Sequence, residues 1–382
     1  MTADGPLAGL LVVDLSRVLA GPFCTRILCD LGARVVKVER PGTGDDSRSY
    51  GPFKDGQSLY FARVNRGKES IALDLKSADG REVLDALLAH ADVLVENFRP
   101  GVMERLGYGP ATLTDRFPRL VALSLSGFGH TGPWSQRPAY DAVVQGMAGV
   151  MAITGAVGGD PVKPGVPVAD LSAGLYGAVA VVSAVHERAR TGRGQHLDVA
   201  MFDTTMSLLE GAALRWLATG DSPDAIGNAH FAIAPFDTFA CADRQIVICA
   251  ANDGLFAKLC AELGLDLGDD ARFAGNAARH ENEGALKALL EGALAAAPAA
   301  EWLVRLEAAG VPCGPVASIA EAVGSEQAVA RTMVVDAGGL PVPGNPIKSS
   351  AHADPQHVAG PPDLDADGPA IRTELGLPER PV

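Results

Sequence analysis

Apolar runs and amphipathic stretches alternate over the first 125 residues of the chain. The segments LLVVDLS, ARVVKVE, SIALDLK, DVLVEN and LVALSLSG are short and apolar, and they are separated by helical patterns such as AGPFCTRILCDLG and GREVLDALLAHA. Strands separated by helices of about 10 to 15 residues are typical of βαβ units and a parallel sheet. The pattern therefore predicts an α/β fold, and ligands on such a sheet bind beyond the carboxyl ends of its strands.

Later segments predict a second, smaller domain. Two long helical patterns, LSAGLYGAVAVVSAVHERARTG and VAMFDTTMSLLEGAALRWLATG, precede a loop, and strands FDTFACA and QIVICAAN with several helices follow it. The Pro-rich tail is expected to pack back on the first domain. We therefore divide the chain into a large domain (1–200, completed by 330–382), a linker helix and loop (201–225), a small α+β domain (226–318), and a return linker with the C-terminal part of the large domain (319–382).

The charge of the chain is acidic and unevenly distributed. The net charge is −14, yet residues 1–110 hold 14 basic and 15 acidic side chains, so nearly all of the excess lies in the rest of the chain. An acidic chain is poorly suited to neutralising phosphates, which disfavours nucleic acid as a partner. An anionic small molecule is expected to bind to the first segment instead.

Cysteine spacing and hydropathy indicate the cellular compartment in which we expect the protein. The six cysteines form no CxxC pair and have no histidine at metal-ligand spacing, so we expect neither a metal site nor disulfides. The N-terminal sequence lacks the basic region of a signal peptide, and no apolar run approaches the roughly 20 residues of a membrane helix. These features predict a cytoplasmic protein with no membrane partner.

Asp170 is the strongest local candidate for chemistry. It ends the apolar run in PGVPVADLSAGLYGAV and stands immediately before a helical pattern, where backbone N–H groups stabilise an anion. The small residues Ala169, Ser172, Ala173 and Gly174 leave room for a ligand. A carboxylate that is ionised at pH 7 is a competent nucleophile toward a thioester. An ordinary N-cap role for Asp170 remains the alternative on this local evidence.

Basic residues recur just past the ends of the predicted strands, and no GxGxxG loop accompanies them. The absence of that loop argues against a dinucleotide-binding domain. A phosphate-bearing ligand is favoured by this placement, although scattered solvated charges are the alternative. The positions concerned are Arg40, the NRGK segment of 65–68, Lys76, Arg99 and Arg105.

Several blocks, taken in order, resemble the class III CoA-transferases, also called the CaiB/BaiF family. They include GLLVVDLSRVLAGPFCTRILCDLGARVVKVERPGTGD, NRGKESIALDLKSADG, DVLVENFRPGVMERLG, LSGFGHTGPW, YDAVVQGMAGVMAITG, GVPVADLSAGLYGA, TGRGQHLDVAMFD and GVPCGPV, and they span nearly the whole chain. The family includes formyl-CoA transferase, carnitine CoA-transferase and the α-methylacyl-CoA racemases.

The resemblance implies a Rossmann-like large domain in an interlocked homodimer, and it implies covalent catalysis on Asp170. The carboxylate would form an aspartyl anhydride and then an aspartyl-CoA thioester. Coenzyme A and acyl-CoA would be substrates, with no permanently bound cofactor and no metal. By the same resemblance, Arg40, Lys76 and Arg105 would meet the CoA phosphates, and Leu73, Asn97, Phe98 and Arg99 would line the adenine and pantetheine path. Supporting residues would be Tyr140 and Asp141, with oxyanion donors among Gly127, Gly129 and Gly227.

Departures from the family pattern argue against some of the activities found in the family. Formyl-CoA transferases carry Gln where this chain has Leu19, and the racemases carry His where it has Tyr140. We therefore predict transfer of CoA from a small acyl-CoA such as succinyl-CoA to an organic acid. Arg17 and His230 are candidates for holding the acceptor carboxylate. An acyl-CoA racemase that uses Asp170 for proton transfer and a non-catalytic acyl-CoA-binding paralogue are the alternatives.

Overall fold

The computed structural model describes residues 5–378, which form two compact units. The first unit contains the described residues up to 150, together with 163–222 and everything from 326 onward; the second contains 151–162 and 223–325. The segment 151–162 thus belongs to the second unit, whereas the sequence-based division placed it in the large domain.

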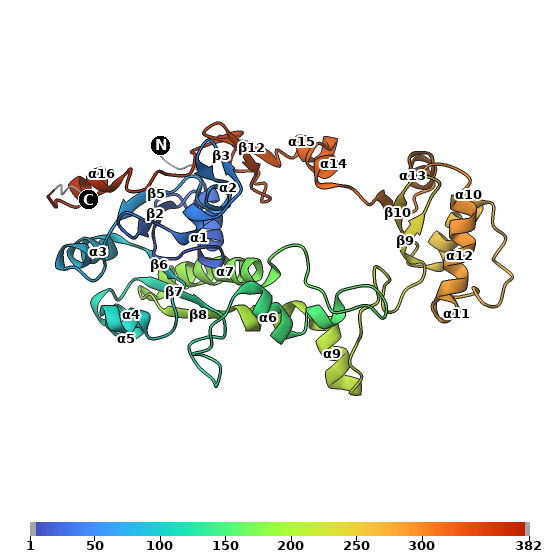
Figure 1. Cartoon of the computed structure of the whole chain (residues 1–382), viewed down its shortest axis with the longest axis horizontal. Helices are drawn as coiled ribbons and strands as arrows, with labels where there is room; N and C mark the ends of the chain where they lie inside the picture. Colours follow the sequence, from blue (N-terminus) through green and yellow to red (C-terminus); the bar gives the residue numbers. More distant parts are fainter. Residues whose placement is uncertain (1–4, 379–382) are drawn as a thin grey trace. The chain divides into compact units, whose positions relative to one another are not determined.

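A six-stranded parallel sheet forms the centre of the first unit (Figure 1). Every adjacent pair of strands is parallel, as the alternating pattern predicted. Numbered along the chain, the strands follow the order 3-2-1-4-5-6 of a Rossmann fold, so the order reverses between the first and fourth strands and a ligand crevice is expected there. In spatial order the strands are β5 (Glu69–Ala72), β2 (Arg34–Glu39), β1 (Leu11–Asp14), β6 (Val93–Glu96), β7 (Val121–Ser126) and β8 (His196–Ala200).

Helices cover both faces of this sheet and form two hydrophobic clusters. On one face, α1 (Ala20–Asp30) and α7 (Val168–Thr191) bury Cys24, Leu28 and Ala173 against the strands. On the other, α3 (Ala78–His90) contributes Leu84 and Leu88, and α16 (Gly368–Glu374) adds Ile371. The end of the described chain therefore completes the core of the large unit.

Close packing of α7 on α1 depends on a glycine. A Cβ atom added at Gly174 would lie 2.8 Å from the carbonyl oxygen of Ala20 and 2.8 Å from the Phe23 ring. Only glycine allows this approach, because the Ala20 backbone and the Phe23 ring cannot both move away from an added Cβ atom. The first turns of α7 are thereby fixed beside the beginning of α1.

Helix α7 also has an apolar face that is exposed among the described residues. It is 24 residues long and apolar enough, by length and composition, to cross a membrane, with 44% of its apolar window buried. The sequence analysis predicted this helix but did not recognise that its length and composition would allow it to cross a membrane. One such helix is weak evidence for a membrane, since a core helix has the same composition, and one side of α7 packs on the sheet. The outward side carries the exposed residues Leu175, Tyr176, Val179 and Val182.

The first unit contains further helices and short strands. They are η1 (Asp46–Ser49), β3 (Phe53–Lys54), β4 (Gln57–Ser58), α2 (Leu59–Asn65), α4 (Val102–Leu106), α5 (Pro110–Arg116), α6 (Asp141–Ala148), α8 (Met201–Leu208), α9 (Glu210–Thr219), α15 (Glu326–Ala330), β12 (Val334–Ala337), β13 (Leu340–Pro343) and β14 (His357–Val358).

The second unit is an α+β structure with its own core. Its antiparallel sheet has the order β11 (Cys313–Pro315), β10 (Gln245–Cys249), β9 (Phe236–Ala240). Phe239, Leu290 and Trp302 are buried between this sheet and its helices, and the Trp302 indole N–H donates to the Leu294 carbonyl over 2.8 Å. The other elements are η2 (Met151–Ile153), α10 (Asp253–Leu263), α11 (Asn276–Glu281), α12 (Glu283–Leu294), α13 (Ala299–Ala308) and α14 (Ile319–Val323).

Candidate active site

Asp170 lies in the first turn of α7, but it is not the N-cap. Pro167 occupies the N-cap position, so Asp170 is the third helical residue and the N-cap interpretation is wrong. The cap is supplied from outside the helix: the Asp141 Oδ1 atom accepts the amide N–H groups of Ala169 and Asp170, over 2.9 and 3.3 Å. Within residues 5–378, no group donates a hydrogen bond to the Asp170 carboxylate, which leaves it available to a substrate.

The surroundings of Asp170 make its carboxylate unusually basic. Burial and the negative charge of Asp141 raise its pKa to about 7, and the nearby cation of Arg63 opposes the rise. The positive end of α7 also favours the anion. The sequence analysis treated this carboxylate as ionised at neutral pH, whereas the structure makes it about half protonated there.

The first βα turn, residues 15–19, faces the start of α7. Gly174 packs against Ala20 at the beginning of α1, and Asp170 is one turn earlier on the same side of α7. Val18 has a φ of +69°, which is rare for a β-branched residue. Its amide N–H donates to the Asp45 carboxylate over 3.1 Å, and this contact helps to hold the strained backbone.

A buried ionic network supports this turn. The Lys68 ammonium donates to Asp14 Oδ2 over 2.9 Å, to Thr25 Oγ1 over 2.7 Å and to Asn65 Oδ1 over 2.8 Å. Burial alone would raise the pKa of Asp14, but Lys68 and Lys37 outweigh it and lower that pKa to about 2. Both Lys68 and Asp14 have side chains that are 0% exposed.

The NRGK segment was therefore misassigned to ligand binding. Lys68 is fully buried, and Arg66 forms a buried ion pair with Asp30 over 2.5 Å. Their positive charges neutralise internal carboxylates and do not reach a phosphate. This segment positions the first βα turn.

Three of the predicted ligand residues meet at the point where the strand order reverses. The Arg17 amide N–H donates to Asn97 Oδ1 over 2.9 Å, and Asn97 Nδ2 donates back to the Arg17 carbonyl over 2.8 Å. These contacts join the turn after β1 to the loop after β6. The side chains of Arg17 and Arg40 both pair with Asp46, at the beginning of η1. The carboxyl edge of β1, β2 and β6 is thus rich in arginine.

Other predicted CoA contacts differ in how accessible they are. Lys76, Arg99 and Arg105 are exposed on segments that follow β5 and β6. The Phe98 ring packs against the core, and its amide N–H donates to Glu96 Oε2 over 2.7 Å. Leu73 is 3% exposed within the core, so only its backbone remains to line a ligand path.

Several substrate-side predictions do not fit the contacts observed. Leu19 is 3% exposed, which leaves its side chain little access to a substrate. The Gly129 amide already donates to Ser126 Oγ over 2.9 Å, and the Gly227 amide donates to the Gly155 carbonyl over 3.0 Å. Neither amide is free for an oxyanion. At Gly127, an added Cβ would lie 2.2 Å from the Cβ of Ala139, so close packing accounts for that glycine.

His230 and Tyr140 occupy different environments. His230 belongs to the second unit, where its ring stacks on Phe231 and its Nδ1 accepts the Ala232 amide N–H over 3.1 Å. Tyr140 lies immediately before α6 in the first unit and is 76% exposed. The exposed Tyr140 ring is free to contact a ligand or a second chain.

Sequence reasoning missed an aromatic and cationic group on α2. The Arg63 guanidinium lies over the Tyr60 ring, with 3.8 Å from its Cζ to the ring centroid, and Tyr50 meets Tyr60 edge to face at 5.4 Å. Burial raises the pKa of Tyr60, the Arg63 cation opposes that rise, and the charge of Asp170 adds to it. The three-residue spacing of Tyr60 and Arg63 in SLYFARVN was the available signal, because it places both on one helix face.

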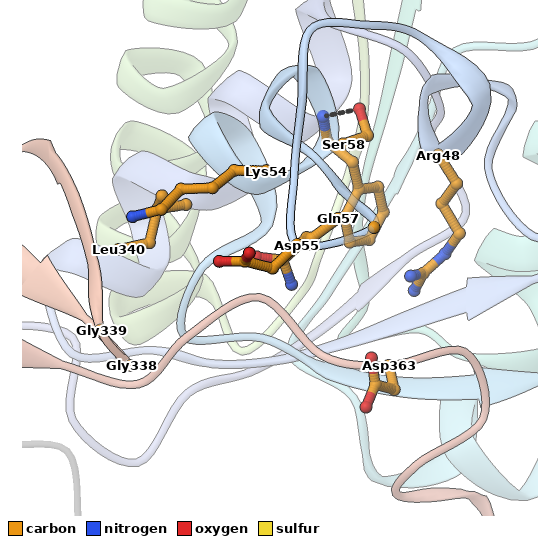
Figure 2. A pocket seen from close by; sticks show the side chains of 11 residues that line it. Arg48, Lys54, Asp55, Gln57, Ser58, Gly338, Gly339, Leu340 and Asp363 are labelled. Atoms are coloured by element: carbon orange, nitrogen blue, oxygen red, sulfur yellow. Dashed lines mark hydrogen bonds between the residues drawn. The ribbon is translucent and has the colours of Figure 1, made fainter.

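A separate cavity of about 590 Å³ in the first unit does not contain Asp170. Figure 2 shows it between the β3–β4 hairpin, with Lys54 and Asp55, and the turn before β13, with Arg48 and Asp363 also at its wall. Two cations and two anions give it no net charge that would select an ionic substrate. Within residues 5–378, no group of three or more His, Cys, Asp or Glu residues is arranged to hold a metal ion.

Comparison with known proteins shows which family the chain belongs to. The chain matches the sequence model of CoA-transferase family III over residues 7–368. It is 50% identical to acetyl-CoA:oxalate CoA-transferase of Acetobacter aceti, over 98% of this chain and 97% of that protein. It is 39% identical to succinyl-CoA:glutarate CoA-transferase of Mus musculus, over 90% of this chain and 81% of that protein.

A solved structure extends the likeness to three dimensions. The crystal structure of a CaiB/BaiF family protein from Brucella suis matches with a TM-score of 0.88 and 43% identity, covering 97% of this chain and 100% of that chain. A match that covers this much of the chain includes residues of both units. The chain therefore belongs to CoA-transferase family III, and it is a CoA-transferase as the resemblance implied.

Proposed function

We propose that this enzyme moves CoA from a small acyl-CoA to a small dicarboxylic acid, with the Asp170 carboxylate as the nucleophile. The observation that carries the proposal is a carboxylate in the first turn of α7 that no group among the described residues hydrogen-bonds, on a helix that packs on a Rossmann-type sheet. The dicarboxylic class follows from similar proteins, whose names specify oxalate, glutarate and mesaconate.

The reaction proceeds through acyl exchange on one carboxyl group. An Asp170 oxygen attacks the thioester carbonyl, the C–S bond breaks, and CoA thiolate leaves a mixed anhydride behind. The thiolate then attacks the Asp170 carbonyl carbon, which expels the donor acid as its carboxylate and forms aspartyl-CoA thioester. The acceptor carboxylate attacks this thioester and releases the thiolate again. Attack of the thiolate on the acceptor carbonyl yields the new acyl-CoA and restores Asp170.

The first unit supplies binding groups for CoA in this proposal. Arg40, Arg99, Arg105 and Lys76 lie along the carboxyl edge of the sheet, where cations attract the phosphates of CoA. Arg40 would exchange part of its contact with Asp46 for a phosphate. Asn97 would act through the backbone of Arg17, which it holds in place.

The assay is a direct search for CoA exchange. The protein is incubated with succinyl-CoA or acetyl-CoA and a panel of acids, and new CoA esters are followed by mass spectrometry. Transfer to a dicarboxylate with a covalent adduct on Asp170, trapped by hydroxylamine, supports the proposal. Deuterium exchange at the α-carbon of an acyl-CoA without any acceptor would indicate a racemase. Tight binding of CoA esters with no turnover would indicate a non-catalytic paralogue.

The pH dependence of the rate should report the state of Asp170. Since its pKa is raised to about 7, kcat/KM should increase about tenfold per pH unit below pH 7 and level off above it. Asp141→Asn removes the neighbouring charge but keeps an oxygen to cap α7, so the inflection should move to lower pH. Rates measured from pH 5 to 9 in both enzymes test this, and an unmoved inflection would contradict it.

We also propose a homodimer, in which a second chain covers the apolar face of α7. Leu175 and Val179 are 52% and 63% exposed, and Trp216 on α9 of the same unit is 54% exposed. Apolar surface of this extent is typical of an interface. Light scattering should give twice the 39.4 kDa chain mass. The double variant Leu175→Glu/Val179→Glu should lose the dimer, whereas Val329→Glu, at an exposed valine on α15, should retain it. A monomeric parent protein would refute the proposal.

A further inference from the structure

A buried glutamine contacts the carboxylate that caps α7. Gln145 lies on α6, one turn after Asp141, and it is 0% exposed. Its Nε2 atom donates a hydrogen bond to Asp141 Oδ2 over 2.5 Å. Its Oε1 atom has no hydrogen-bond partner in the described part of the chain. Among residues 5–378, the bond to Asp141 is therefore the one hydrogen bond of this side-chain amide.

Packing alone does not account for a glutamine at this position. A buried amide whose carbonyl oxygen is unpaired carries a desolvation cost that an apolar side chain of similar volume would avoid. The contact with Asp141 also defines how the amide is oriented, because only its N–H side can face an ionised carboxylate. The polar character of Gln145 is thus explained by its contact with Asp141.

The Asp141 carboxylate joins α6 to the first turn of α7. Its Oδ2 atom accepts the Gln145 N–H, and its Oδ1 atom accepts the amide N–H groups of Ala169 and Asp170 over 2.9 and 3.3 Å. A carboxylate with a donor on each oxygen cannot turn about its Cβ–Cγ bond without losing those contacts. Gln145 therefore fixes the plane of the group that holds the backbone of Asp170.

We propose that Gln145 is a positioning residue for the reaction: its amide holds the Asp141 carboxylate in the orientation that caps α7 and so places the Asp170 carboxylate for attack on the thioester. The inference rests on the proposed CoA-transfer function, because Gln145 acts on the reaction only through the nucleophile. Placement matters to the rate, since a displacement of about 1 Å at a reacting group costs up to about 10²-fold.

Gln145→Met tests the proposal, because methionine has a similar volume but no N–H donor. We expect kcat for CoA transfer to fall about 10-fold, while the KM for acyl-CoA changes by less than about twofold. Rates of formation of new CoA esters, followed by mass spectrometry, give both constants. An Asp–Gln pair four residues apart that only stabilised α6 would leave kcat unchanged.

Gln195→Met is the matched control. The Gln195 Nε2 atom also donates to a carboxylate, Glu187 Oε2, over 2.9 Å, but this pair is exposed and Glu187 lies toward the C-terminal end of α7. The variant loses the same kind of hydrogen bond, far along the helix from its first turn. It should keep the kcat of the parent.

The pH profile separates positioning from a general loss of folded enzyme. Burial and the charge of Asp141 raise the pKa of Asp170, and the cation of Arg63 opposes the rise. Without Gln145, Asp141 is free to turn away from α7, so the inflection of kcat/KM should move to lower pH. In the Asp141→Asn background that charge is already absent, and adding Gln145→Met should leave the inflection in place. A loss of folded enzyme would lower the rate at every pH and move no inflection.

Hydrogen–deuterium exchange gives a measurement that does not depend on turnover. The amide N–H groups of Ala169 and Asp170 are protected while Asp141 accepts them, so they should exchange about 10-fold faster in Gln145→Met than in the parent or in Gln195→Met. An active parent enzyme in which Gln145→Met changes neither kcat, the inflection nor this exchange would overturn the inference alone. A parent enzyme that transfers CoA to no acid would overturn the proposed function and this inference together.

Discussion

Asp170→Asn should abolish CoA transfer while leaving the fold intact. Asparagine keeps the shape of the side chain but cannot form an anhydride, and no second unpaired carboxylate is available at the start of α7, where the Asp141 oxygens already accept hydrogen bonds. We expect kcat to fall by about 10³-fold or more. Mass spectrometry of CoA esters measures the rate, with Asp115→Asn on the exposed side of α5 as a control that keeps full activity.

The same substitution should make the protein more stable at alkaline pH. The folded pKa of Asp170 is about 7, above the value of 3.8 that is usual for an aspartate, so the folded state penalises the ionised form. That penalty is absent below about pH 4, grows between pH 4 and 7, and is constant above. Asp170→Asn removes it, so its unfolding free energy at pH 8 should exceed that of the parent by about 1 to 2 kcal/mol.

The combination of lost activity and gained stability separates a nucleophile from a structural residue. Urea denaturation at pH 5 and pH 8 provides the comparison. A residue that only capped α7 would lose about 1 kcal/mol of stability on substitution and keep its turnover. Retained transfer in Asp170→Asn would rule out the covalent mechanism.

The parallel sheet was predictable because its signal is local. The first five strands of the sheet, β1, β2, β5, β6 and β7, are short apolar runs separated by helical patterns, and each folds as its own period dictates. The last strand, β8, was not predicted. Its residues His196–Ala200 lead directly into α8, and the end of this strand was included in a helical pattern. The placement of Asp170 at the start of a helix was likewise predictable from the residues around it.

Partners that lie far apart in the chain were not predictable. Asp141 caps a helix that begins 27 residues later, and Lys68 pairs with a carboxylate 54 residues earlier. A sequence shows that a lysine is present but not whether it meets water, a phosphate or a buried carboxylate. The amides of Gly129 and Gly227 failed as oxyanion donors for the same reason, since tertiary contacts decide which acceptor an N–H group finds.

Arg63 was a different kind of omission. Its spacing from Tyr60 was visible, but an exposed arginine on a short helix is ordinary. Its contact with the Tyr60 ring, and the influence of its charge on the pKa of Asp170, which follows Arg63 by more than 100 residues in the chain, are features of the folded structure.

Lys68→Met should destabilise the protein strongly at neutral pH. Methionine fills a similar volume, but it leaves the Asp14 carboxylate buried without its closest cation and strips Thr25 and Asn65 of a donor. Breaking a buried ion pair by removing one partner costs about 3 to 5 kcal/mol. Urea denaturation at pH 7 measures the loss. Lys76→Met, at an exposed lysine, is the matched control and should change stability by less than about 0.5 kcal/mol.

The pH dependence of that loss identifies its cause. In the parent, Lys68 and Lys37 hold the pKa of Asp14 at about 2, so this carboxylate contributes stability above about pH 4, and the contribution disappears as the pH falls toward 2. Without Lys68, burial raises the pKa of Asp14, and the ionised carboxylate then destabilises the folded state. The stability deficit of Lys68→Met should therefore be largest at neutral pH and shrink toward pH 4. A deficit that does not vary with pH would mean that lost packing, and not an unpaired charge beneath the first βα turn, explains the effect.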